Sequence, residues 1–126
     1  VHDLVIQDIL DVNQRPKFQE YDDYWFFSTK SILPSKNHEI ESEQLSFIIG
    51  NNFLISFQEK KGDVFDPVRK RIKVGKGLSR SRKADYLVYM LIDIVVDNYY
   101  EILEDISEKI EYLYLKYQNQ TFVYPN

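Results

Sequence analysis

The stretch Ser81–Gln118, SRKADYLVYMLIDIVVDNYYEILEDISEKIEYLYLKYQ, decides how the rest of the chain is interpreted. It contains neither Gly nor Pro. Its apolar residues recur in steps of three and four, the spacing of a helix. They are Ala84, Val88, Leu91, Val95, Tyr99, Ile102, Ile106, Ile110 and Leu113. At 1.5 Å per residue a helix over 81–118 would be about 57 Å long. Because an ordinary domain helix is shorter, we expect this one to extend beyond the domain.

The acidic side of this helix contains the first candidate site. Six carboxylates share an arc opposite the apolar one: Asp93, Asp97, Glu101, Glu104, Glu108 and Glu111. Through residues 86–96 almost every other direction is apolar, so we expect burial on several sides there. A lone charge such as Asp93 in those surroundings is costly unless it is paired or bound to a metal. Mg²⁺ keeps several of its waters and needs only one or two carboxylates from each protein surface that it contacts. Asp93 is therefore a candidate ligand, with Asp8 or Asp97 as a second one.

Upstream of the long helix the pattern predicts two short helices and a small sheet. We expect a helix over 2–12, a three-stranded antiparallel meander over 17–59 and a helix over 66–74. Ile48 and Leu54 fall on the face opposite the other apolar strand residues, so both faces of the sheet should be covered. The predicted fold class is α+β and α/β/α sandwich-like, with a mostly antiparallel sheet, short helices and one long C-terminal helix.

Composition narrows the function classes. The chain has 126 residues and is 44% hydrophobic, enough for one domain with a core. It has no cysteine and two histidines, which disfavours a zinc site of the usual His/Cys kind. No hydrolase triad is recognisable, and the lone Gly75-Lys76-Gly77 follows a predicted helix, so we predict that the chain is not an enzyme. No apolar run approaches 18 residues, so none is expected to span a bilayer.

Charge is distributed in blocks along the chain. Residues 59–83 hold ten basic and three acidic side chains, whereas the flanking blocks are acidic. The basic belt, residues 60–83, could bind nucleic acid or anionic lipid. The favoured interpretation is a solvated helix and linker, because the aromatics of the belt are few and the eight acids that follow it can neutralise it in the fold. A soluble membrane- or nucleic-acid-binding module therefore stays an alternative, although no nucleic-acid partner is expected.

Several runs of residues resemble the cytoplasmic domain of the CorA family of magnesium and cobalt transporters. They are HDLVIQDIL at 2–10, NQRPK at 13–17, ESEQ at 41–44, FQEKKGDVFDPVR at 57–69 and ADYLVYMLID at 84–93. The resemblance implies that residues 1–126 are part of the cytoplasmic domain of a homopentamer in the cell or inner membrane. The stalk, the transmembrane helices and their Gly-Met-Asn signature are expected to lie outside this chain.

The resemblance also implies a regulatory role for Mg²⁺, and for Co²⁺ as a second ion. Family regulation relies on intracellular Mg²⁺ bridging neighbouring protomers, which favours the closed pentamer. Motif by motif, the ligands of the cytoplasmic domain fall on Asp8 and Asp93, with Gln7 and Asp97 as weaker candidates. Gln7 occupies a place that is often acidic, so an ion there would lose a charged ligand. The zinc-transporting branch shares this architecture and remains the alternative within the superfamily.

Overall fold

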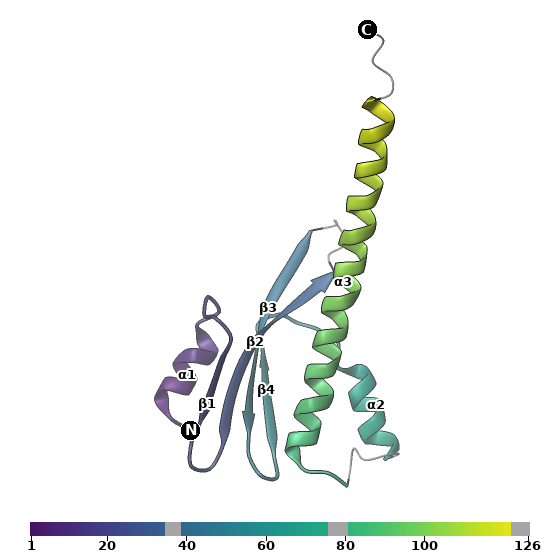
Figure 1. Ribbon diagram of the computed structural model, residues 1–126. Coiled ribbons are helices and arrows are strands. Elements are labelled where there is room, and N and C mark those ends of the chain that lie inside the picture. Colours follow the sequence, from purple (N-terminus) through teal and green to yellow (C-terminus); the bar gives the residue numbers. More distant parts are fainter. Residues whose placement is uncertain (35–38, 76–80, 122–126) are drawn as a thin grey trace.

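The computed structural model describes residues 1–34, 39–75 and 81–121 of the chain (Figure 1). Its elements in chain order are α1 (Asp3–Leu10), β1 (Lys17–Glu20), β2 (Trp25–Pro34), β3 (Ile40–Ile49), β4 (Leu54–Gln58), α2 (Asp66–Val74) and α3 (Ala84–Thr121). The four strands pair antiparallel in the order β1-β2-β3-β4. The predicted α+β class, with an antiparallel sheet and one long C-terminal helix, is confirmed.

The prediction of three strands over residues 17–59 is wrong, because residues 17–34 form two strands. The chain reverses between Tyr21 and Tyr24, where the Tyr21 N–H donates to the Tyr24 carbonyl at 2.9 Å. Two aspartates lie between these tyrosines, and aspartate favours turns because its side chain can bond to nearby backbone groups. With no Gly or Pro at this point, the sequence pattern did not separate β1 from β2.

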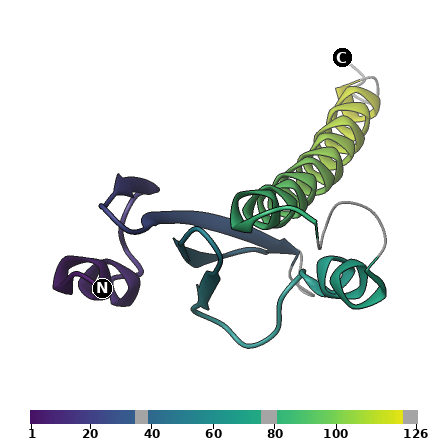
Figure 2. The same cartoon turned by 90° about the horizontal axis from the view of Figure 1, so that it is seen from below.

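Helices cover both faces of the sheet, as expected, and Figure 2 shows α1 and α3 on opposite sides of it. On the α1 face, Val5 packs with Phe26 and Ile48. On the α3 face, alternate residues of β3 pack against α3 and the start of α2. One expected placement is wrong: Leu54 pairs with Ile49 and therefore lies on the α3 face, not beside Ile48. The physical reason is that the tight turn between β3 and β4 sets the register of β4.

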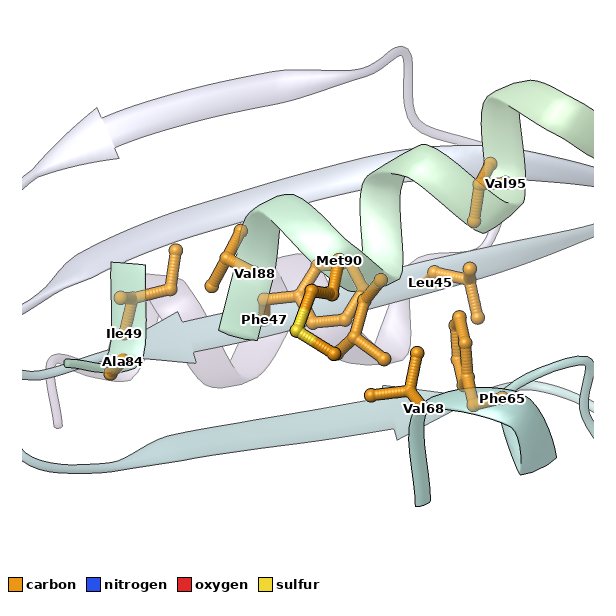
Figure 3. Close-up of a cluster of buried hydrophobic side chains, with 10 residues drawn as sticks. Leu45, Phe47, Ile49, Phe65, Val68, Ala84, Val88, Met90 and Val95 are labelled. Carbon is orange, nitrogen blue, oxygen red and sulfur yellow. The ribbon is translucent and has the colours of Figure 1, made fainter. Parts of the chain in front are cut away.

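The larger core lies between β3, α2 and α3 (Figure 3). Its ten buried residues are Leu45, Phe47, Ile49, Phe65, Val68, Ala84, Val88, Met90, Leu91 and Val95. Strand residues contribute at every second position, as a pleated strand requires. In α3, Ala84, Val88, Leu91 and Val95 recur at steps of three and four, and Met90 adds a side chain beside them. The α3 side chains Val88 and Met90 point toward Phe47 of β3 (Figure 3). This packing fixes the N-terminal half of α3 on the sheet.

The long helix begins and ends three residues later than residues 81–118, the range predicted for it. Its first turn starts where the Tyr86 N–H donates to the Lys83 carbonyl at 3.1 Å. The C-terminal half of α3 continues past the end of the sheet (Figure 1). Beyond Tyr99 no α3 side chain in the described range is buried. The expectation that this helix extends out of the domain is therefore met.

Candidate divalent-cation sites

Asp8 is the most enclosed carboxylate on α1, with 6% of the residue exposed. Its Oδ2 accepts a hydrogen bond from Lys17 Nζ at 2.7 Å, and its Oδ1 accepts one from Gln14 Nε2 at 2.8 Å. The Lys17 bond is the main cause of a lowered pKa at Asp8, and the Gln14 bond adds to it against the opposing effect of burial. Asp8 is therefore an anion at neutral pH, with both oxygens already bonded.

The position of Asp8 and its partners follows from how α1 and the turn after it lie on the sheet. Val5 and Asp8 lie three positions apart on α1, so both face the sheet. The amide of Gln44 on β3 donates to the Asp8 carbonyl at 3.0 Å and fastens this part of α1 to the sheet. After α1, the turn before Pro16 brings the chain back along the helix. That return places Gln14 and Lys17 beside the Asp8 carboxylate.

Asp93 lies in a different environment from the one expected, since it is exposed to solvent. The prediction of burial on several sides through residues 86–96 holds for the apolar residues, because all of them except Tyr89 and Val96 are buried or half-buried. Asp93 lies with these two on the exposed stripe of the helix, while its other sides pack against the sheet and α2. Asp97 is also exposed and lies one turn after Asp93. Because residues four apart share a helix face, these two carboxylates are neighbours on the surface.

The structure does not bring Asp8 and Asp93 together. Asp8 is on α1, which packs on the face of Phe26, whereas Asp93 is on α3 across the sheet. Gln7 is exposed on α1, and as the residue next to Asp8 it points to another side of the helix. Within the described part of the chain, no group of three or more His, Asp or Glu side chains could hold a metal ion. Asp8 and the pair of Asp93 with Asp97 are therefore two separate candidate sites on one copy.

The two candidate sites differ in how well they suit a hard cation. The exposed pair Asp93 and Asp97 suits a hydrated Mg²⁺, which keeps several waters and needs one or two carboxylates. Asp8 does not offer a free oxygen while Lys17 and Gln14 are bonded to it. The Lys17 ammonium occupies the position of a cation, so a metal ion could bind Asp8 only by displacing it.

Sequence reasoning missed another buried acid, Glu43 on β3, which is 2% exposed. Its Oε2 accepts from the Lys60 N–H at 3.2 Å. Burial raises the pKa of Glu43 and outweighs the hydrogen bonds from Lys60 and Gln58, which act in the opposite direction. The available signal was alternation: Glu43 shares the strand face of Leu45, which is in the core. The partners of Asp8, Gln14 and Lys17, had no comparable signal.

The basic belt is partly neutralised within the fold. Arg69 donates from Nη1 to Asp63 Oδ1 at 2.6 Å and to Asp66 Oδ1 at 3.0 Å. These hydrogen bonds, above all those to Asp63, raise the pKa of Arg69. Three further bases of α2, Lys70, Arg71 and Lys73, are exposed. Residues 76–80 of the belt lie outside the described residues.

Similarity to known proteins identifies the family of this chain. The chain matches the family described as "CorA-like Mg2+ transporter protein" over residues 1–121. It belongs to the CorA family. The cobalt/magnesium transport protein CorA of Thermotoga maritima is 50% identical over 114 residues, 90% of this chain. A putative metal ion transporter of Bacillus subtilis, YfjQ, is 26% identical over 110 residues, 86% of this chain.

The match covers only part of these CorA-family relatives. The aligned region is 32% of the Thermotoga protein and 33% of the Bacillus protein, so this chain spans about a third of their length. Among the described residues, no helix combines the length and hydropathy that crossing a membrane requires. Both relatives are described as metal ion transporters, and the family is one of transporters and not of enzymes.

Proposed function

We propose that this chain is part of the cytoplasmic regulatory domain of a CorA-like transporter of Mg²⁺ or Co²⁺. The observation that carries the proposal is the 50% identity to a cobalt/magnesium transport protein over 90% of the chain. The α/β/α arrangement agrees with it, because α1 and α3 present acidic residues on two sides of one sheet. The whole transporter is proposed to be a homopentamer in the cell membrane.

The proposed regulation is a linkage between ion binding and the arrangement of subunits. Asp93 and Asp97 supply two exposed carboxylates, and a neighbouring copy supplies the remaining ligands. Bound Mg²⁺ would contribute positive charge shared between the copies. Without it, carboxylates of adjacent copies repel one another and the ring loosens. A ligand that binds the closed arrangement better shifts the population toward that arrangement.

Asp8 is a ligand in this proposal only when Lys17 leaves its carboxylate. Its carboxylate is anionic but paired with Lys17, so Lys17 and a divalent cation compete for the same oxygen. The side chain of Lys17 is 40% exposed, so it can swing into solvent when a cation approaches. Gln7, next along α1, offers an amide oxygen as a neutral ligand and would bind a cation more weakly than a carboxylate.

Limited proteolysis of the whole transporter in vesicles, at rising Mg²⁺ concentration, tests the proposal. Asp93→Asn should raise the Mg²⁺ concentration needed for protection roughly tenfold, the effect of about 1.4 kcal/mol in binding. Glu111→Gln, an exposed acid further along α3, is the matched control and should behave as the parent. Equal protection curves for Asp93→Asn and the control would remove Asp93 from the mechanism.

Lys17→Met tests Asp8 separately. If Asp8 is a ligand that Lys17 blocks, this variant needs less Mg²⁺ for protection than the parent. If the Lys17 pair is only structural, the variant loses stability and its Mg²⁺ dependence does not change. Uptake of Mg²⁺, Co²⁺ and Zn²⁺ by the same vesicles measures the transported ion. Transport of Zn²⁺ alone would favour the zinc-transporting branch.

A further inference from the structure

A buried polar cluster, made of Glu43, Ser31 and Asn98, lies beside the core and has no part in the proposed regulation. Glu43 on β3 is 2% exposed and lies two positions before the core residue Leu45, on the same face of the strand. Ser31 on β2 is 1% exposed and pairs directly with Glu43. Because paired residues of antiparallel strands share one face of a sheet, both side chains point to the α3 face.

The turn of α3 that contains Asn98 lies over this part of the sheet. Asn98 follows the core residue Val95 by three positions and therefore shares the side of the helix that faces the sheet. The next residue, Tyr99, donates from its hydroxyl to the Lys30 carbonyl at 2.6 Å. That bond holds this turn of α3 against β2 beside Ser31. The polar cluster is thus enclosed between two strands and α3.

Two groups of the polar cluster lack hydrogen-bond partners. In the part of the chain that the structure describes, neither the Ser31 hydroxyl oxygen nor Asn98 Nδ2 has a partner, although both atoms are buried. Nearly all buried polar groups in folded proteins are hydrogen-bonded, because an unpaired one destabilises the fold. The Ser31 oxygen can accept a hydrogen bond, and a neutral carboxyl group carries an O–H that can donate one. Glu43 in its neutral form is therefore a donor for Ser31.

Glu43 also holds the chain after β4, which lies on the other side of β3 from β2. Its Oε2 accepts from the Lys60 N–H at 3.2 Å. A carboxyl group has two oxygens, so a neutral Glu43 can accept from Lys60 with one and donate to Ser31 with the other. Lys60 is the first residue of the basic belt, so this contact attaches the start of the belt to the sheet.

The surroundings of Glu43 disfavour its charged form. Burial is the largest effect and raises the pKa of Glu43. The negative charge of Glu59 raises this pKa as well, whereas the ammonium of Lys60 lowers it. That ammonium lies 3.5 Å from a carboxylate oxygen of Glu41, so it is shared between two acids. The members of the polar cluster on β2 and α3 carry no charge.

We propose that Glu43 is a proton-sensitive contact, which holds the chain after β4 against β3 when it is neutral and releases it when it is charged. Loss of the proton to solvent leaves a buried charge, and such a charge is costly until water reaches it. Water reaches Glu43 when Lys60 and the residues that lead to α2 move off β3. A group whose pKa is raised in the closed state stabilises that state at low pH. The stabilisation is lost as pH rises through the closed-state value.

Amide hydrogen exchange of the 126-residue chain, followed by NMR at pH 4.5, 6 and 7.5 and corrected for the intrinsic exchange rate, tests the proposal. The Lys60 amide is the reporter, because its N–H is bound to Glu43. We expect its protection factor to fall by at least about threefold from pH 4.5 to pH 7.5. Glu43→Gln keeps an acceptor for Lys60 but has no proton to lose, so its protection factor should not fall. Constant protection in the parent, or an equal fall in this variant, overturns the proposal.

A pair of serine variants tests the acceptor. Ser31→Ala removes the partner of neutral Glu43, so it should lower the protection of Lys60 at pH 4.5 and leave it within about twofold of the parent at pH 7.5. Ser28→Ala is the matched control. Ser28 is 2% exposed and its hydroxyl also has no partner among the described residues, but it pairs with Ser46 on the α1 face. Equal pH profiles for the two variants overturn the proposal. None of these residues is a proposed ligand of the cation, so the result is independent of the proposed regulation.

Discussion

At the residue level, two buried carboxylates, Asp8 on α1 and Glu43 on β3, have pKa values shifted in opposite directions. Asp8 is held by an ammonium and an amide, which stabilise its charged form. Glu43 on β3 accepts hydrogen bonds from the Lys60 N–H and from Gln58, but its burial disfavours the charged form. These two groups should therefore make stability depend on pH with opposite signs.

Asp8→Asn should lower the free energy of unfolding by about 1–2 kcal/mol at pH 7, because Lys17 loses its charged partner. The pKa of Asp8 is depressed in the folded state, so its contribution is present above the unfolded value, about 4. It is lost as pH falls through the folded value. Urea unfolding between pH 7 and pH 3.5 should show parent and variant converging at the acid end.

The control for Asp8 is Asp3→Asn, since Asp3 is an exposed acid on the same helix. It should change stability by a few tenths of a kcal/mol at most. A constant difference between Asp8→Asn and the parent at every pH would show that the Lys17 pair is not the origin of the effect.

Glu43→Gln should leave stability unchanged or raise it by about 1 kcal/mol at pH 7, because the amide oxygen can still accept from Lys60 without a buried charge. A folded pKa raised above the unfolded one means that stability is present below the unfolded pKa and lost as pH rises through the folded value. The advantage of the variant should therefore disappear near pH 4. Thermal unfolding at pH 4 and pH 7 measures it. A loss of 2 kcal/mol or more at pH 7 would contradict this account.

At the level of elements, α3 consists of two halves with different roles. The half that begins at Ala84 is held by the sheet and α2, while the half after Tyr99 has no buried side chain in the described range. Stability of this helix therefore comes from tertiary packing at one end only, which is the usual source of helical stability in proteins.

A pair of leucine substitutions separates these halves. Leu91→Ala removes a core side chain that is 7% exposed and should cost about 2–5 kcal/mol. Leu115→Ala, at an exposed site away from the core, should cost less than about 0.5 kcal/mol. Urea unfolding of both variants at the same protein concentration gives the comparison. Similar losses at the two sites would mean that the projecting half contributes to the core.

At the level of the whole molecule, carboxylates are numerous but dispersed. Net charge is −4, and no cluster of three potential ligands exists among the described residues. Asp8 and the Asp93–Asp97 pair are separated by the sheet. The proposed cation site therefore takes its remaining ligands from another copy.

The isolated chain should consequently respond weakly to Mg²⁺. With a dissociation constant no tighter than about 1 mM, 1 mM Mg²⁺ stabilises by at most about 0.4 kcal/mol. That corresponds to a rise of less than about 2 °C in the unfolding midpoint. NaCl at matched ionic strength is the control. A rise of 5 °C that Asp93→Asn abolishes would instead show a complete site within one chain.

The sequence by itself determined the features that depend on neighbours along the chain. The spacing from Ala84 onward predicted the long helix, and alternation at Leu45, Phe47 and Ile49 predicted a strand with a core face. The runs at 57–69 and 84–93 pointed to the CorA family, which comparison confirms. Periodicity carries this information because backbone geometry repeats locally, every 3.6 residues in a helix and every two in a strand.

Only the tertiary structure decided which groups meet. It paired Asp8 with Lys17 and exposed Asp93, which the apolar pattern around it had placed in the interior. It also set these two carboxylates on opposite sides of the sheet and buried Glu43. The physical reason is that a side chain's solvent exposure and its charge partners depend on which elements pack against it. Those contacts join residues far apart in the sequence, so no local pattern records them.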